Sequence, residues 1–208
     1  MNIACLSFLF TIVMSAHAGL SGPTVLLPLP QDTILTQYYD TEEIEQLDAI
    51  VAFFDKHVLQ ACQGSDSLAV CYQQLFDRLL NSDTLDVGVP FGEQNEFQLS
   101  NLDRSLFHSI WTYSASRAHE PNGDSQYYND INYNRGGQYW RFLREVSGAE
   151  PYFRKYVEPV EAAGDLPPSL YTGFAYNPSG LDFNDERHRL ILAVHFLTVN
   201  NRIATYPR

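Results

Sequence analysis

Cys62 and Cys71 are the reactive side chains whose chemistry the sequence constrains most. A catalytic redox pair usually has two residues between its cysteines, at a helix start where the dipole lowers one thiol pKa, but here eight residues intervene. Zinc needs about four ligands, and His57 would point about 140° away from Cys62 around a helix. We therefore predict a structural disulfide between Cys62 and Cys71, as is common in exported proteins.

Histidines with neighbouring carboxylates are the next residues that could do chemistry. His119-Glu120 could supply a base and an acid, His188 follows Glu186 at the start of a predicted helix, and His108 lies on another helix. Two carboxylates brought together by folding can hydrolyse a glycosidic bond without a linear motif. The sequence has no nucleophile elbow, no H-E-x-x-H and no phosphate loop. Hydrolysis by Asp/Glu and His from two long loops is therefore the alternative, and binding is favoured.

Two patterns resemble metal sites, but neither has the spacing and residue types that a metal ion requires. His188 and His195 are seven residues apart, about 10 Å along a helix, too far to share one ion, and His195 fits a core histidine bonded to a backbone carbonyl. Residues 130–136 resemble the first half of an EF-hand loop, but Arg135 occupies its glycine position and Arg141 its final ligand position. We predict a polar loop there, and neither a metal nor a cofactor.

Aromatic residues are concentrated in the second half of the chain. Ten of the thirteen tyrosines and both tryptophans follow Asn101, in a mixture with Arg and Asn that is typical of interfaces. Trp111 and Trp140 fall on inward helix faces and are predicted to be core. The aromatic residues in loops are predicted to form a recognition surface for a protein or a glycan: Tyr127, Tyr128, Tyr133, Tyr171, Phe174 and Tyr176.

Helices must position these residues, and two of them are clearly marked at the start of the domain. Asp40 and Glu43 form a capping box, and an apolar seam with helical spacing follows as far as Val58. A second seam runs from Leu68 to Leu79, after a break at residues 63–66. The result is a helical hairpin, across whose corner the two cysteines approach each other.

The rest of the chain predicts further helices separated by long connections. Helices are expected over residues 100–111, 139–148 and 184–202, and from Pro151 to a break or kink near Pro159. Residues 84–98, 118–137 and 165–182 lack a helical period and are predicted connections, the last two long and irregular. Since no alternating strand pattern is visible, the fold class is all-α, a single irregular bundle of about five to six helices.

The amino-terminal region predicts an exported protein. An apolar run from Ile3 to Ala16 precedes Ala16-His17-Ala18, so residues 1–18 read as a secretory signal peptide that would carry Cys5 away. Residues 19–39 contain three prolines and are predicted to form an extended arm, and 40–208 a single helical domain. We expect a periplasmic or extracellular location, with no integral membrane segment after signal removal.

Charge narrows the class of partner. The formal net charge is −12, and residues 19–100 carry thirteen acidic side chains against two basic ones. Such a field repels phosphate backbones and anionic headgroups, so nucleic acid and anionic membrane surfaces are excluded. The favoured function is non-catalytic binding of a protein or glycan. A third possibility is an inhibitor whose acidic first half binds a basic partner.

Overall fold

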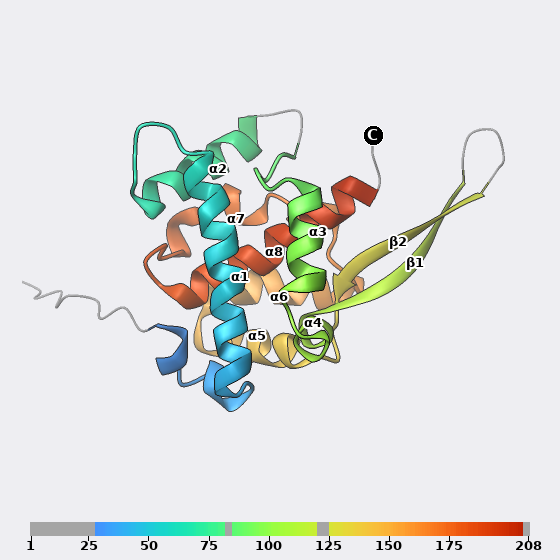
Figure 1. The fold of residues 1–208 in the computed structure, drawn as a ribbon, viewed down its shortest axis with the longest axis horizontal. Helices are drawn as coiled ribbons and strands as arrows, with labels where there is room; N and C mark the ends of the chain where they lie inside the picture. The colour runs from blue at the N-terminus through green and yellow to red at the C-terminus, as the bar shows by residue number, and fades with distance from the viewer. Residues whose placement is uncertain (1–27, 82–84, 120–124, 206–208) are drawn as a thin grey trace, which may run out of the picture.

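Helices dominate the computed structural model, which describes residues 28–81, 85–119 and 125–205, with backbone alone for 114–130 and 203–205. The predicted all-α class is confirmed, and Figure 1 shows one β-hairpin beside the helical body. The helices are α1 (Thr41–Gln60), α2 (Leu68–Asn81), α3 (Phe91–Ser100), α4 (Arg104–Ile110), α5 (Gln138–Ala149), α6 (Pro151–Ala163), α7 (Gly173–Tyr176) and α8 (Glu186–Thr205).

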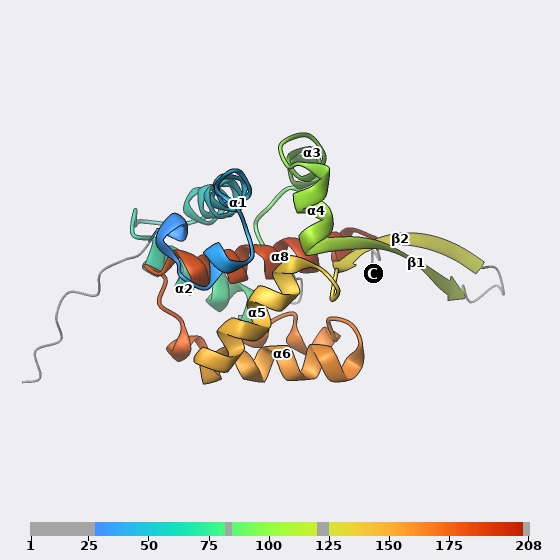
Figure 2. The ribbon, with the colours of Figure 1, turned by 90° about the horizontal axis from the view of Figure 1, so that it is seen from below.

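Helix α8 lies at the centre of the body. Figure 2 shows it between α1 and α3 on one side and α5 and α6 on the other. A helix in this position must be apolar around most of its circumference. The side chains from Leu190 to Leu197 are accordingly fully buried, as the sequence predicts for this helix.

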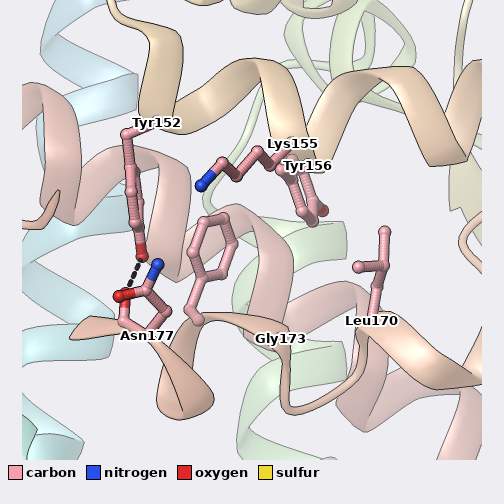
Figure 3. Close-up of a pocket in the computed structure, with 7 residues that line it drawn as sticks. Tyr152, Lys155, Tyr156, Leu170, Gly173 and Asn177 are labelled. Carbon is pink, nitrogen blue, oxygen red and sulfur yellow. Dashed lines mark hydrogen bonds between the residues drawn. The ribbon is translucent and has the colours of Figure 1, made fainter. Parts of the chain in front are cut away.

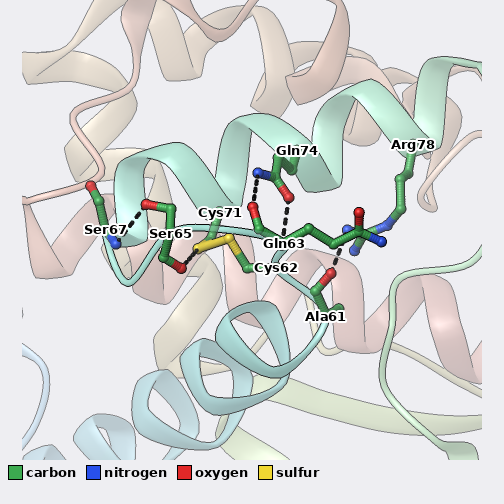
Figure 4. Close-up of a disulfide and its surroundings, with 8 residues drawn as sticks. All are labelled: Ala61, Cys62, Gln63, Ser65, Ser67, Cys71, Gln74 and Arg78. Carbon is green, nitrogen blue, oxygen red and sulfur yellow. Dashed lines mark hydrogen bonds between the residues drawn. A yellow bond between two sulfur atoms is a disulfide. The ribbon is translucent and has the colours of Figure 1, made fainter.

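The predicted disulfide joins the ends of α1 and α2. Cys62 and Cys71 are bonded with their Cα atoms 5.1 Å apart, and Figure 4 shows the bridge across the corner between the two helices. Gln74 closes the same corner, because its side chain exchanges two hydrogen bonds of 2.9 Å with the backbone of Gln63. Closing so short a loop stabilises the fold by about 2–3 kcal/mol in the chain-entropy model.

The capping box is present as predicted. The backbone N–H of Glu43 donates to the Asp40 carboxylate over 2.9 Å, and the Asp40 N–H donates to the Glu43 carboxylate over 3.1 Å. Two N–H groups at the start of α1 are thereby satisfied without help from another helix.

The β-hairpin is the main departure from the prediction. Strands β1 (Trp111–His119) and β2 (Ser125–Tyr133) pair antiparallel from Trp111 opposite Tyr133 to His119 opposite Ser125, where a long polar loop was expected. Figures 1 and 2 show the hairpin extending away from the helices. Its base is held in the core by Trp111, Ile131 and Tyr133. Apolar alternation is confined to the base of the hairpin and is interrupted by Arg117 and Asn129, which explains why the sequence did not reveal the strands.

Helix α3 also corrects the prediction, which placed a connection over residues 84–98. Its buried residues are Gln94, Phe97 and Gln98, so most of its inward face is polar and shows no apolar period. Gln94 has no exposed surface, and its amide donates to the carbonyl of Leu197 in α8 over 2.8 Å. Hydrogen bonds here replace apolar contacts as the link between the two helices.

The described part of the predicted arm, residues 28–39, is not extended. It forms two 3-10 turns, Leu29–Gln31 and Leu35–Gln37, whose leucines Leu29 and Leu35 are fully buried. The Asp32 carboxylate accepts from the N–H groups of Ile34 and Leu35, both over 2.9 Å. An aspartate turn thus folds this segment onto the core.

Two other predictions in the second half need correction. Helix α6 continues through Pro159 to Ala163, because Pro159 and the Lys155 carbonyl it leaves unbonded are on an exposed side of the helix. Residues 165–182 are not irregular throughout, since they contain α7 and two 3-10 turns, Pro168–Leu170 and Pro178–Gly180. This compact segment packs beside α6 and forms the site described next.

Candidate binding site

A pocket with a volume of about 150 Å³ lies between α6 and the segment 165–182. Figure 3 shows side chains from both elements pointing into the space between them. The residues that line it are Tyr152, Lys155, Tyr156, Leu170, Gly173, Phe174 and Asn177. The lining is mostly aromatic and aliphatic, with two polar side chains.

Side chains of α6 form one wall of the pocket. Tyr152 and Tyr156 are four residues apart and therefore lie on the same face of the helix. The Tyr152 hydroxyl donates to the backbone carbonyl of Asn177 over 2.7 Å (Figure 3). Gly180 permits this contact, because a Cβ atom there would lie 2.0 Å from the Tyr152 ring.

The floor of the pocket is part of the core. Phe174 is 3% exposed, and its ring centroid lies 4.6 Å from that of Tyr156 and 5.0 Å from that of His195. His195 Nδ1 bonds to the Tyr156 hydroxyl over 2.9 Å, and Nε2 lies 3.2 Å from the carbonyl oxygen of Tyr171. Burial lowers the pKa of His195 to about 4, so the ring is neutral at neutral pH, as expected for a core histidine.

Polar groups occur at the mouth. Lys155 is exposed, and Figure 3 shows its ammonium group pointing toward Tyr152. The Asn177 side-chain oxygen accepts from Ser179 over 2.9 Å, which fixes the orientation of the amide. Lys155 and the Asn177 amide nitrogen are therefore donors at the rim of an otherwise apolar pocket.

The structure brings together the three predicted residues of the second long segment. Phe174 forms the pocket floor, Tyr171 is half-buried and accepts from Arg202 over 3.3 Å, and Tyr176, at the end of α7, is 74% exposed and is not among the lining residues. Only Tyr176 of these offers a large accessible surface to a partner.

The predicted residues of the first segment are placed differently. Tyr133 is 5% exposed, and its hydroxyl bonds to that of Tyr156 over 2.7 Å, so it supports the pocket from below. Tyr127 and Tyr128 are in β2, opposite Arg117 and Ser116, and their side chains lie outside the described part of the chain. Among the six predicted residues, Tyr133 and Phe174 are therefore core side chains, and Tyr176 is exposed.

The sequence analysis did not single out Tyr152, Lys155, Tyr156 and Asn177, which line the pocket. It placed the two tyrosines in a helix that begins at Pro151, and their spacing of four residues beside a lysine was the available signal. Asn177 had no signal, because only folding brings its segment against α6.

The predicted acid and base residues do not converge in this pocket. His188 accepts from the Asp182 N–H at Nδ1 over 2.9 Å, so Nε2 carries the proton and donates to Glu150 over 2.9 Å. This bond is the main cause that lowers the pKa of Glu150. Glu186 instead accepts from the Leu29 N–H and from Arg189. With both ring nitrogens in use, His188 has an evident structural role.

Of the other candidates, only His108 has a described side chain. His108 contacts the Phe107 and Tyr113 rings, Glu120 lies outside the described residues, and His119 is described by its backbone alone. Among the described residues, no group of three or more His, Cys, Asp or Glu side chains could hold a metal ion.

The EF-hand-like segment is split between two elements. Asp130 lies in β2, where it is paired with Ser114 of β1, and Arg141 lies in α5. The predicted polar loop is therefore a strand, a short turn and a helix start.

Comparisons complete the description of the site. None of the helices in the described part of the chain is long and apolar enough to span a membrane. No family model, no curated protein and no solved structure matches this chain. The site has to be interpreted from its own geometry.

Proposed function

We propose that this protein is an exported, non-catalytic binding protein that anchors one apolar side chain of a protein partner in the pocket between α6 and residues 165–182. The pocket volume of about 150 Å³ carries the proposal. Sites for separate small molecules usually have volumes of about 300–1,000 Å³. A smaller apolar pocket suits a single anchoring side chain, as at the centre of many protein interfaces.

The surroundings of the pocket support this use. Tyr176 is 74% exposed at the end of α7, the helix that carries the lining residues Gly173 and Phe174, and tyrosine combines apolar area with a polar tip. Lys155 provides a polar rim. This combination of an apolar centre and a polar edge is characteristic of interfaces.

A glycan is the other partner class that aromatic rings recognise, by stacking on sugar faces. The pocket volume of about 150 Å³ favours a compact side chain over a flat sugar ring. The hydrolase alternative has less support, because both His188 nitrogens are in structural hydrogen bonds. The disulfide and the apolar amino-terminal run of the sequence support export.

The proposal is tested by titrating isotope-labelled protein with p-cresol, indole and isobutanol, which mimic tyrosine, tryptophan and leucine side chains, and separately with methyl β-glucoside and N-acetylglucosamine. We expect at least one side-chain mimic to shift the amide resonances of Leu170, Gly173 and Asn177. Leu170→Trp should abolish the shifts by filling the mouth. Leu80→Trp is the matched control, because Leu80 is a 37% exposed leucine on α2 that does not line the pocket.

Two outcomes would contradict the proposal. Shifts produced by the sugars and not by the side-chain mimics would assign the pocket to a glycan. The absence of any shift at these residues, or equal shifts in the Leu170→Trp variant, would show that the pocket is not an anchoring site.

A further inference from the structure

A second pocket, with a volume of about 430 Å³, lies where α3, α4 and the start of β1 meet. The lining residues that matter for its chemistry are Gln98, Leu99, Arg104, Phe107, His108 and Tyr113. Its volume falls within the range of about 300–1,000 Å³ that is typical of sites for small ligands. The segments that form this pocket are different from those of the α6 pocket.

Gln98 contributes a buried hydrogen-bond donor without a partner. Its side-chain oxygen accepts from Gln94 and from Asn201, both over 3.3 Å, and these two donors fix the orientation of the amide. Gln98 is 1% exposed, and its Nε2 is buried without a hydrogen bond in the described part of the chain. Buried polar groups are almost always bonded, so this nitrogen indicates a place for an acceptor that a ligand would bring.

Two basic side chains line the same pocket as Gln98. Arg104 and His108 are four residues apart and therefore project from the same face of α4. Arg104 is exposed and forms no ion pair with any described residue. Asp103 also lines the pocket, and its carboxylate accepts from the Gln46 amide over 2.7 Å. The pocket thus offers donors and positive charge in a protein whose net charge is −12.

Apolar surface completes the pocket. Leu99 is 57% exposed and Tyr113 52% exposed. The Tyr113 ring stacks on Phe107 with 5.4 Å between centroids. Covering such exposed apolar side chains with a ligand removes their surface from water, which favours binding.

We propose that this pocket binds a carboxylate carried on an apolar body. The carboxylate accepts hydrogen bonds from Gln98 Nε2 and the Arg104 guanidinium, and the apolar body packs against Leu99, Phe107 and Tyr113. Charge-assisted bonds of this kind are stronger than neutral ones, so the acid is preferred over its amide. The carboxylate could belong to a free organic acid or to the carboxyl terminus of a peptide, since both present the same group.

The test compares acids with their neutral amides by calorimetry and amide resonance shifts. The probes are 4-phenylbutyrate against 4-phenylbutyramide, and acetyl-Leu-Phe with a free carboxyl terminus against the same dipeptide amidated. At least one acid should bind at least tenfold more tightly than its amide and should shift the resonances of Gln98, Leu99 and His108. Preference for the dipeptide acid would indicate a peptide terminus, and preference for phenylbutyrate a free acid.

Substitutions at Arg104 and Gln98 test whether these two residues bind the carboxylate. Arg104→Gln should weaken acid binding at least tenfold, whereas Arg154→Gln, on an exposed arginine of α6 that does not line the pocket, should leave it unchanged. Gln98→Met removes the donor, and Gln94 and Asn201 both keep the Leu197 carbonyl as an acceptor, so the variant should fold while binding the acid at least tenfold more weakly. Equal binding of acid and amide, no binding of either, or unchanged affinity in both variants would overturn the proposal.

Discussion

Hydroxyl groups and one imidazole form a buried network beneath the α6 pocket. His195 bonds to the Tyr156 hydroxyl, and that hydroxyl bonds to Tyr133 over 2.7 Å. Burial is the largest cause that raises the pKa of both tyrosines and lowers that of His195, so all three groups are neutral at neutral pH. The network joins β2, α6 and α8, and through His195 it also holds the carbonyl of Tyr171.

The His195 network predicts a specific loss of stability in acid. The pKa of His195 is about 4 in the folded protein and about 6.5 in the unfolded chain. Below pH 6.5 the unfolded state therefore binds a proton that the folded state does not, so the free energy of unfolding falls as the pH decreases towards 4. Between pH 7 and pH 5 this residue alone should remove about 2 kcal/mol.

Urea unfolding of the wild type and of His195→Gln at both pH values measures this contribution. Glutamine can still donate and accept hydrogen bonds at this position, and the other titrating groups are common to both proteins. The variant should be less stable at pH 7 but should lose about 2 kcal/mol less than the wild type between the two pH values. An equal loss in both would show that His195 is not responsible.

At the level of elements, the sequence predicted those helices whose buried face is apolar. Helices α1, α2, α5 and α8 lie close to their predicted positions, because each carries apolar residues at helical spacing. The Asp40 capping box and the Cys62–Cys71 bridge were predictable for a related reason, since both depend on residues close together in the chain.

The elements that were missed show little apolar periodicity. Helix α3 packs through Gln94 and Gln98, and most of the hairpin lies beyond the helical body (Figure 2). The pockets were missed because each is formed by separate elements whose relative placement depends on folding. The contact of Asn177 with Tyr152 is one example, and the pocket that α3 and α4 form with the start of β1 is another. Composition identified Phe174 and Tyr176 as aromatic residues near a site, but not which of them is accessible.

Gly137, directly before α5, lies against the backbone of α4 near the base of the hairpin. A Cβ atom at this position would lie 2.1 Å from the backbone oxygen of Ser109 in α4, whereas one at Gly136 would meet only the Asn134 side chain, at 3.5 Å. Asn134 joins the same elements through its N–H, which donates to the Ile110 carbonyl over 2.8 Å. Glycine is therefore required by close backbone approach at one of two adjacent positions.

We expect Gly137→Ala to lower the free energy of unfolding by about 1–3 kcal/mol, because backbone atoms would have to move apart. Gly136→Ala is the matched control and should change it by less than about 0.5 kcal/mol. Chemical denaturation of the two variants and the wild type compares them directly. Similar stability of both variants would mean that α4 and α5 do not approach as closely as described.

On the scale of the whole molecule, ion pairs fasten the amino-terminal segment to the centre. Arg187 at the start of α8 bonds to Asp32 and, over 2.7 Å, to Glu150, while Glu186 accepts from the Leu29 N–H over 2.9 Å. Asp32 is 3% exposed, so its charge requires a partner. Residues 28–39, α8 and the junction of α5 with α6 are thus held as one body. Among the described side chains of the hairpin, those at its base, Trp111, Ile131 and Tyr133, are buried in this body.

The attachment of the hairpin predicts that its outer part is dispensable for folding. An isolated two-stranded hairpin is at best marginally stable in water, so strands beyond the body contribute little to global stability. Replacing residues 115–129 by Asn-Gly would join Ser114 to Asp130, which are already opposite each other, through a favoured two-residue turn. The base residues Trp111, Ile131 and Tyr133 would remain buried.

The shortened protein should unfold cooperatively, with a free energy of unfolding within about 1 kcal/mol of the wild-type value. Because the lining residues of both pockets lie outside the deleted range, binding of the side-chain mimics and of the carboxylates should also persist. A much larger loss of stability would show that the outer strands pack against the helical body. Unchanged stability with loss of binding would instead place part of a recognition surface on the hairpin, where Tyr127 and Tyr128 were predicted to act.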